Sequence, residues 1–84
     1  MIIYLIFSEE GYEEVKPSLF SEQAILWVNN DLLSEAQLLE LKQQAIEVNI
    51  FPEMVDGSHE KSIMQALIPI ENQHPNAEIL VEYL

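Results

Sequence analysis

The hydrophobic positions of the chain fall into four short blocks that have the patterns of β-strands. Residues 2–7 and 24–28 are unbroken apolar runs, which is the pattern of strands covered on both faces. Residues 46–51 and 78–84 alternate apolar and polar side chains, which is typical of strands with one solvated face. The simplest sheet therefore has the first two blocks in its centre and the last two at its edges.

A helix is predicted after the second strand. Ser34 and Gln37 fit a capping box, in which each side chain would bond to the backbone of the other residue, and this predicts a helix over residues 35–44. The connection between the first two strands, residues 8–23, is harder to interpret. It could hold a short helix over residues 13–20 or form only a loop.

A second helix is predicted over residues 59–72. Asp56 or Ser58 would cap its N-terminus, since short polar side chains accept hydrogen bonds from the free amides of a first turn. Pro69 carries no amide hydrogen and cannot bond back along the helix. We therefore expect a kink or a stop at this residue.

The alternation of strands and helices predicts an α/β fold with a mostly parallel four-stranded sheet, formed by residues 1–84 as a single domain. The first connection decides whether the first strand is parallel to the others. We favour a crossover with a helix there, because an unbroken apolar strand needs cover on both of its faces.

The charge of the chain excludes several partners. Fifteen acidic residues, three lysines and no arginine give a net charge of −12 in 84 residues. Nucleic acids and anionic membranes are held by clusters of basic residues, so neither is expected as a ligand. The absence of cysteine excludes disulfide bonds, thiolate zinc sites and a cysteine nucleophile.

The apolar run at the start of the chain is too short for a signal core or a membrane span. It lacks a basic flank and ends at Ser8, Glu9 and Glu10. We therefore interpret it as a buried strand and expect a cytoplasmic protein.

A metal site is the sharpest chemical hypothesis. Ligands of parallel sheets collect beyond the carboxyl ends of the strands, and the loops there carry several acidic residues. Glu9 or Glu10, together with Asp31 and Asp56, could supply the oxygen ligands that Mg²⁺ or Ca²⁺ prefers. The alternative is that these residues are caps and turns, which use short acidic side chains for local hydrogen bonds.

No catalytic or cofactor motif accompanies these acids. The two glycines form no phosphate-binding loop. His59 could act as a general base beside Asp56 or Glu53, or it could be a solvent-exposed residue at the start of a helix. We therefore assign no catalytic residue and no resident cofactor.

Spare apolar residues in two connections suggest contact with another protein. Phe51, Met54 and Val55 follow the third strand, and Tyr12 and Phe20 lie in the first connection. Apolar side chains in loops either pack under a neighbouring helix or form a patch for a partner.

The resulting functional hypothesis is a small, non-catalytic protein-binding or regulatory domain with a basic protein partner. One alternative is a small metal-dependent enzyme, and another is an acidic mimic of nucleic acid that inhibits a basic DNA- or RNA-binding protein. Trp27 is interpreted as a core residue. Glu78 and Glu82 would guard an edge strand against uncontrolled pairing, although they do not forbid a homodimer.

Overall fold

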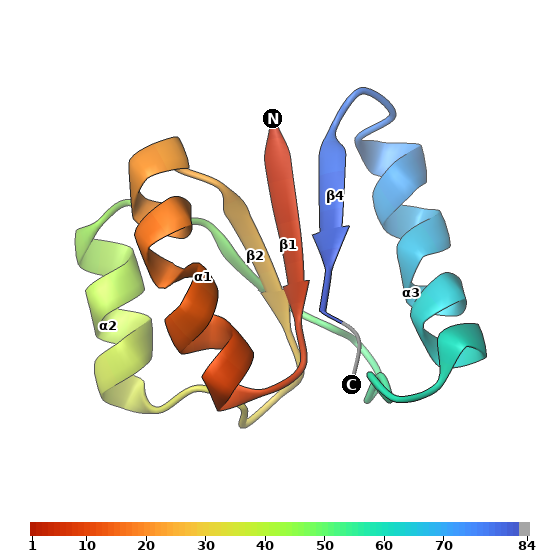
Figure 1. Ribbon diagram of the computed structural model, residues 1–84, viewed down its shortest axis with the longest axis horizontal. Coiled ribbons are helices and arrows are strands. Elements are labelled where there is room, and N and C mark those ends of the chain that lie inside the picture. Colours follow the sequence, from red (N-terminus) through yellow and green to blue (C-terminus); the bar gives the residue numbers. More distant parts are fainter. Residues whose placement is uncertain (83–84) are drawn as a thin grey trace.

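Strands and helices alternate along the chain in the computed structural model, which describes residues 1–82 (Figure 1). This confirms the predicted α/β fold, including the crossover helix in the first connection. The elements are β1 (Ile2–Ile6), α1 (Glu9–Glu22), β2 (Ile25–Val28), α2 (Glu35–Gln43), β3 (Val48–Ile50), α3 (Glu60–Gln73) and β4 (Glu78–Val81).

The four strands form one parallel sheet in the order β3-β2-β1-β4. The two unbroken apolar strands are central and the two alternating strands are at the edges, as the pattern predicts. Ile3 of β1 pairs with Ile25 of β2 on one side and with Ile79 of β4 on the other. The predicted last strand extended to residue 84, but β4 ends at Val81, and residues 83–84 lie outside the described part of the chain.

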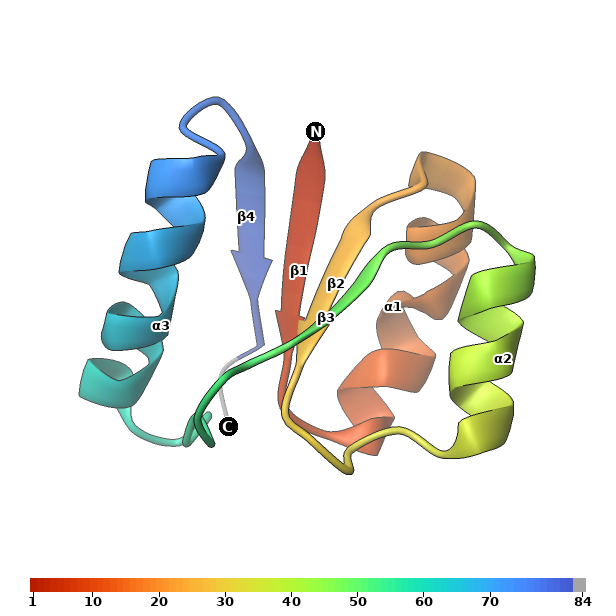
Figure 2. The same ribbon diagram turned by 180° about the vertical axis from the view of Figure 1, so that it is seen from behind.

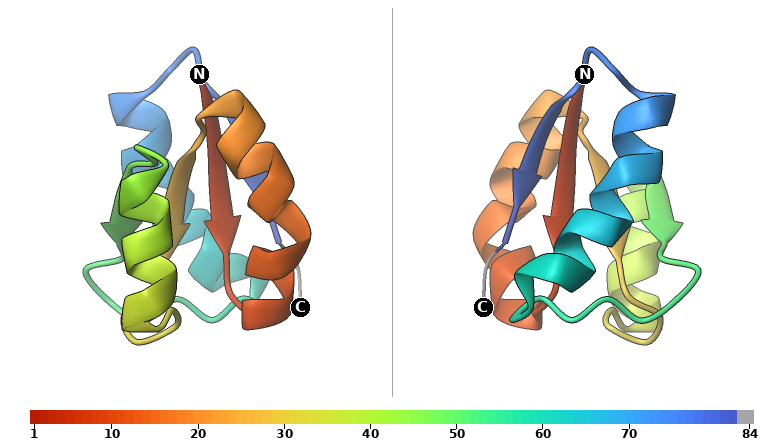
Figure 3. Two further views of the ribbon diagram at one scale, coloured as in Figure 1. Left: turned by 90° about the vertical axis from the view of Figure 1, so that its left-hand side faces the viewer. Right: turned by 90° about the vertical axis from the view of Figure 1, so that its right-hand side faces the viewer.

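The strand order explains why the helices divide between the two faces of the sheet. The chain moves from β1 to β2 to β3 in one direction, so right-handed crossovers place α1 and α2 on the same face. The return from β3 to β4 reverses direction, so α3 lies on the opposite face (Figures 2 and 3). One face therefore carries two helices and the other carries one.

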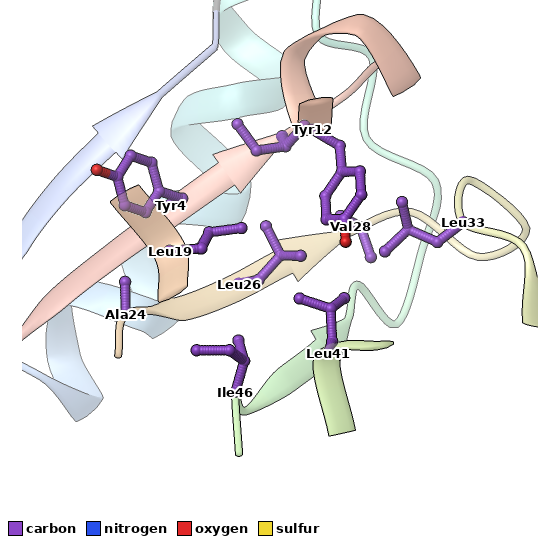
Figure 4. Close-up of a cluster of buried hydrophobic side chains, with 10 residues drawn as sticks. Tyr4, Tyr12, Leu19, Ala24, Leu26, Val28, Leu33, Leu41 and Ile46 are labelled. Atoms are coloured by element: carbon purple, nitrogen blue, oxygen red, sulfur yellow. The ribbon is translucent and has the colours of Figure 1, made fainter. Parts of the chain in front are cut away.

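Each face of the sheet has its own apolar core. The α1/α2 face buries a cluster that includes Tyr12, Leu19, Leu26 and Leu41, all of them inaccessible to solvent (Figure 4). The α3 face buries Ile3, Leu5, Phe7, Ile25, Phe51, Val55, Ile63 and Ile70. Alternate residues of β1 point to opposite cores, as the pleat of a strand requires.

Helix α1 is longer than the predicted residues 13–20 because it has a good N-cap. The side chain of Ser8 accepts a hydrogen bond from the backbone N–H of Gly11, and Glu9 and Glu10 occupy the first turn, where the helix dipole favours acids. Pro17 lies inside the helix and does not end it.

The predicted capping box of α2 is confirmed. The N–H of Ser34 donates to Gln37 Oε1 at 2.8 Å, and the N–H of Gln37 donates to Ser34 Oγ at 3.1 Å.

For α3, the predicted N-cap is wrong and the predicted stop at Pro69 does not occur. Its N-cap is His59, which makes no side-chain capping bond, because the Asp56 side chain bonds to Ser58 before the helix begins. The helix also continues through Pro69 to Gln73. A buried stripe that includes Ile63 and Ile70 holds both of its halves against the sheet, which outweighs the hydrogen bond that proline cannot make.

Candidate functional site

The carboxyl ends of the strands, where the sequence predicts a ligand site, are closed by the chain itself. After β3, residues 51–59 run beneath the ends of β2 and β1 to reach α3 on the other side (Figure 2). We call residues 51–59 the crossing segment. It is fixed at two points: Val55 is bonded to Asn29 at the end of β2, and Gly57 lies against the ring of Phe7 after β1.

The side chain of Glu82 fills the position between the ends of β1 and β4. Its carboxylate accepts hydrogen bonds from the N–H of Phe7 at 2.7 Å, from the N–H of Ser8 at 3.0 Å and from the hydroxyl of Ser8 at 2.6 Å. In doubly wound sheets this is the crevice where the strand order reverses, and the N-terminus of the following helix attracts anions there. Glu82 thus serves as an internal anion for α1 rather than as the exposed guard of an edge.

The side chain of Asn29 holds the crossing segment against β2. Its amide nitrogen donates to the carbonyl of Val55 at 2.8 Å, and its carbonyl accepts from the N–H of Val55 at 2.8 Å. Both bonds are buried, and Asn29 is 8% exposed. Asn29, which the sequence places among polar loop residues, therefore has a structural role: it connects the end of β2 to the crossing segment.

The four acids of the predicted metal site lie on three separate loops or helix ends. Glu9 and Glu10 are exposed in the first turn of α1, and Asp31 is exposed in a left-handed turn after β2. Within residues 1–82, no group of three or more histidine, cysteine, aspartate or glutamate side chains is arranged to hold a metal ion. The metal site stays a prediction. The surroundings of Asp56 match the alternative interpretation, in which this acid is a turn residue that makes local hydrogen bonds.

Asp56 organises the turn before α3. Its Oδ1 accepts hydrogen bonds from the N–H of Ser58 at 2.9 Å and the hydroxyl of Ser58 at 2.6 Å, and its Oδ2 lies 2.8 Å from His59 Nδ1. These bonds, first those from Ser58 and then the one with His59, lower the pKa of Asp56 from 3.8 to about 2. The His59 side chain is 74% exposed, and no nucleophile is bonded to its ring within the described residues.

The lowered pKa of Asp56 predicts a pH-dependent contribution to stability. A carboxyl group whose pKa is lower in the folded chain stabilises the fold above its usual pKa and loses that effect as the pH falls. The melting temperature of the parent should therefore exceed that of Asp56→Asn at neutral pH. This difference in melting temperature should shrink as the pH falls from about 4 to about 2, and it should vanish at still lower pH. A margin that does not vary with pH would contradict this assignment.

An open groove lies on the α3 face of the sheet, where the single helix leaves part of the face uncovered. Its volume is about 360 Å³. Trp27 of β2 and Phe51, the first residue of the crossing segment, lie side by side in the groove, and the two walls are the rest of the crossing segment and α3. The remaining lining residues are Pro52, Glu53, Met54, Val55, Ser62, Gln65, Ala66, Pro69, Ile70 and Gln73. We call this the α3 groove.

The aromatic rings of Trp27 and Phe51 form the floor of the α3 groove, and Phe7 supports Phe51 without lining the groove. The ring of Phe51 stacks on that of Phe7 with centroids 5.8 Å apart and an angle of 14° between their planes, and the Trp27 ring lies 5.4 Å from Phe51. Trp27 is half-buried, and its indole N–H is buried without a hydrogen-bond partner among residues 1–82. The interpretation of Trp27 as a core residue is thus incomplete, because its side chain also borders the groove.

The charge at the α3 groove comes from Glu53. It is the one charged residue among the described residues that line the groove, and it forms no ion pair within them. The chain's lysines lie elsewhere: Lys16 is paired with Glu40 at 2.8 Å on the other face, and neither Lys42 nor Lys61 lines the groove. The groove is therefore mainly apolar, with a few neutral polar side chains and a single acidic one.

The structure divides the five predicted partner-binding residues between the two faces of the sheet. Phe51, Met54 and Val55 line the α3 groove together, with Met54 76% exposed. Tyr12 and Phe20 belong to α1: Tyr12 is fully buried in the core of the α1/α2 face and Phe20 packs against that core, so neither lies at the groove.

The sequence reasoning missed the contribution of α3. The predicted fold itself indicated an opening: a single helix cannot cover one whole face of a four-stranded sheet, so part of the sheet beside α3 stays uncovered.

None of the helices within residues 1–82 has the length and apolar character needed to cross a membrane. Comparison of the chain with protein-family models, with curated proteins and with solved structures found no match. The α3 groove and the charge around it are the features of the molecule that point to a function.

Proposed function

We propose that this chain is a non-catalytic protein-binding domain that holds a basic segment of a partner protein in the α3 groove. The observation that carries the proposal is an open apolar groove with an aromatic floor on a chain of net charge −12. Its volume of about 360 Å³ lies within the range of ~300–1,000 Å³ that is usual for binding pockets.

The side chains around the groove are of the types that contact partners. Aromatic residues and methionine are enriched in protein interfaces, and the flexible thioether of methionine adapts to the surface it meets. Met54 exposes most of its side chain on the crossing segment, while Trp27 remains half-buried on the floor. A partner would cover both residues and remove their apolar surface from water.

The charge of the domain favours a basic partner over a second copy of the chain. Fifteen acidic residues attract cationic segments and accelerate their association, whereas two copies repel each other at low salt. Salt screens such attraction over ~8–10 Å, so binding should weaken as the ionic strength rises.

Selection from a displayed library of random dodecapeptides tests this proposal. The expected result is enrichment of peptides that combine apolar residues with lysine or arginine. Amide resonances of the crossing segment and α3, and the indole resonance of Trp27, should shift on their addition.

A positive charge introduced at the groove should weaken the binding of the selected peptides. Gln65→Arg places a cation on the groove wall and should lower their affinity about tenfold. Gln43→Arg adds the same charge at an exposed position of α2, away from the groove, and should change the affinity less than about twofold. Equal effects of the two variants, or shifts outside the groove, would contradict the proposal. Concentration-dependent self-association that Gln65→Arg abolishes would instead identify a second copy as the occupant.

A further inference from the structure

The α3 groove combines three features that match one kind of side chain. Its walls are apolar along Val55, Ala66 and Ile70, its floor presents the aromatic ring of Trp27, and its edge carries the carboxylate of Glu53. An apolar stem with a cationic end can satisfy all three, because lysine and arginine bury their methylene chains while the charged group reaches polar surroundings.

The aromatic floor favours a cation for a second reason. The face of an aromatic ring is electron-rich, and tryptophan attracts a nearby ammonium or guanidinium group more strongly than phenylalanine or tyrosine does. The ring of Phe51 packs against Trp27 and is itself stacked on Phe7, which restricts the movement of the Trp27 ring. The same chain already places a lysine near an aromatic ring on its other face, where Lys16 Nζ lies 5.9 Å from the ring centre of Tyr12.

Glu53 is available for an incoming cation. It is exposed, it has no hydrogen-bond or ion-pair partner among residues 1–82, and no lysine lines the groove beside it. A purely apolar anchor would leave this carboxylate unused, and an acidic anchor would be repelled by it and by the net charge of the domain.

We infer that the α3 groove takes a single long basic side chain, lysine or arginine, as the anchor of the bound segment. This inference rests on the proposed function. The methylene stem lies along Val55, Ala66 and Ile70, and the cation lies between the Trp27 ring and the carboxylate of Glu53. Apolar residues next to the anchor contact Met54, which is 76% exposed.

The test is a double-mutant cycle between Glu53→Gln and the anchor of the selected peptide. Glu53→Gln keeps the size of the side chain and removes its charge, and it should weaken the parent peptide about fivefold. Replacing the lysine or arginine anchor by methionine should weaken binding similarly. The two changes together should cost little more than one alone, because each removes the same interaction.

Glu14→Gln provides the matched control. It removes one negative charge from an exposed position of α1 on the other face of the sheet, so it should change the affinity less than about twofold. A second readout is the Trp27 indole resonance, which should shift with the parent peptide and shift much less with the methionine peptide.

The outcomes separate the inference from the proposed function. If peptides bind in the groove but Glu53→Gln behaves like Glu14→Gln, or if the anchor is an aromatic or aliphatic residue, the basic anchor is wrong and protein binding stands. If no peptide is selected, or if binding ignores Gln65→Arg, both are wrong.

Discussion

Replacing Glu82 by alanine is expected to lower the free energy of unfolding by about 2–4 kcal/mol. The change removes the acceptor for the N–H groups of Phe7 and Ser8 and for the Ser8 hydroxyl. It also removes a negative charge next to the N-terminus of α1, and the attraction between that charge and the helix dipole is lost. Urea denaturation measures the loss directly. Glu82→Gln, which keeps one acceptor oxygen, should lose about 1 kcal/mol.

Gly11 provides a sharper test of the same contact. A β-carbon at this position would overlap the Glu82 carboxylate, which cannot move aside without breaking its hydrogen bonds. Gly11→Ala should therefore destabilise the parent chain by about 1–2 kcal/mol. In the Glu82→Ala background the space is free, and the same change should stabilise the chain by about 0.5–1 kcal/mol, the usual gain from replacing glycine by alanine in a helix.

The reversal of sign distinguishes this contact from a general effect on helix stability. Glu78→Ala removes an exposed acid from the same strand and should change stability by less than about 0.5 kcal/mol. If Gly11→Ala has the same effect in both backgrounds, the carboxylate does not occupy the helix N-terminus in solution.

Asn29→Ala is expected to cost about 2–4 kcal/mol, because it leaves the buried N–H and carbonyl of Val55 without partners. The crossing segment should also loosen, so the amide of Val55 should exchange with solvent faster than in the parent. Denaturation and hydrogen exchange measure the two effects. Asn30→Ala is the control, since its side chain is exposed, and it should cost less than about 0.5 kcal/mol.

Asn29→Asp separates the two hydrogen bonds. A carboxylate can still accept from the N–H of Val55, but it would be repelled by the Val55 carbonyl unless it carries a proton. Burial and this repulsion should raise the pKa of the introduced group in the folded state. The variant should therefore be closest to the parent at low pH and lose stability as the pH rises through that pKa. A pH-independent difference would contradict the assigned bonds.

The hydrophobic pattern distinguished the central strands of the sheet from the edge strands. Unbroken runs at residues 2–7 and 24–28 indicated central strands, and alternating residues at 46–51 and 78–84 indicated edges. Burial on two faces or on one is recorded directly in the side chains of a strand, so this information is local. The capping box of Ser34 and Gln37 is local for the same reason, since both partners lie within one turn.

The candidate site was predicted only in part. The spare apolar side chains of Phe51, Met54 and Val55 indicated a surface of interest, and the structure places all three at one groove. The other wall of that groove comes from α3, and its floor from Trp27 of β2. These residues are distant in sequence, and no pattern within either segment records that they meet.

The sequence by itself determined which strands are central and which lie at the edges, the helix that follows Ser34, and the sign of the charge that any partner meets. Each of these follows from local periodicity or from counting residues. The tertiary structure alone decided what the carboxyl ends of the strands do. Glu82 and Asn29 have the residue types of a ligand site, but they bond to Ser8 and Val55 across the fold and close that edge. It also decided where the opening lies, because one helix covers less than one face of the sheet and leaves the ring of Trp27 beside a groove.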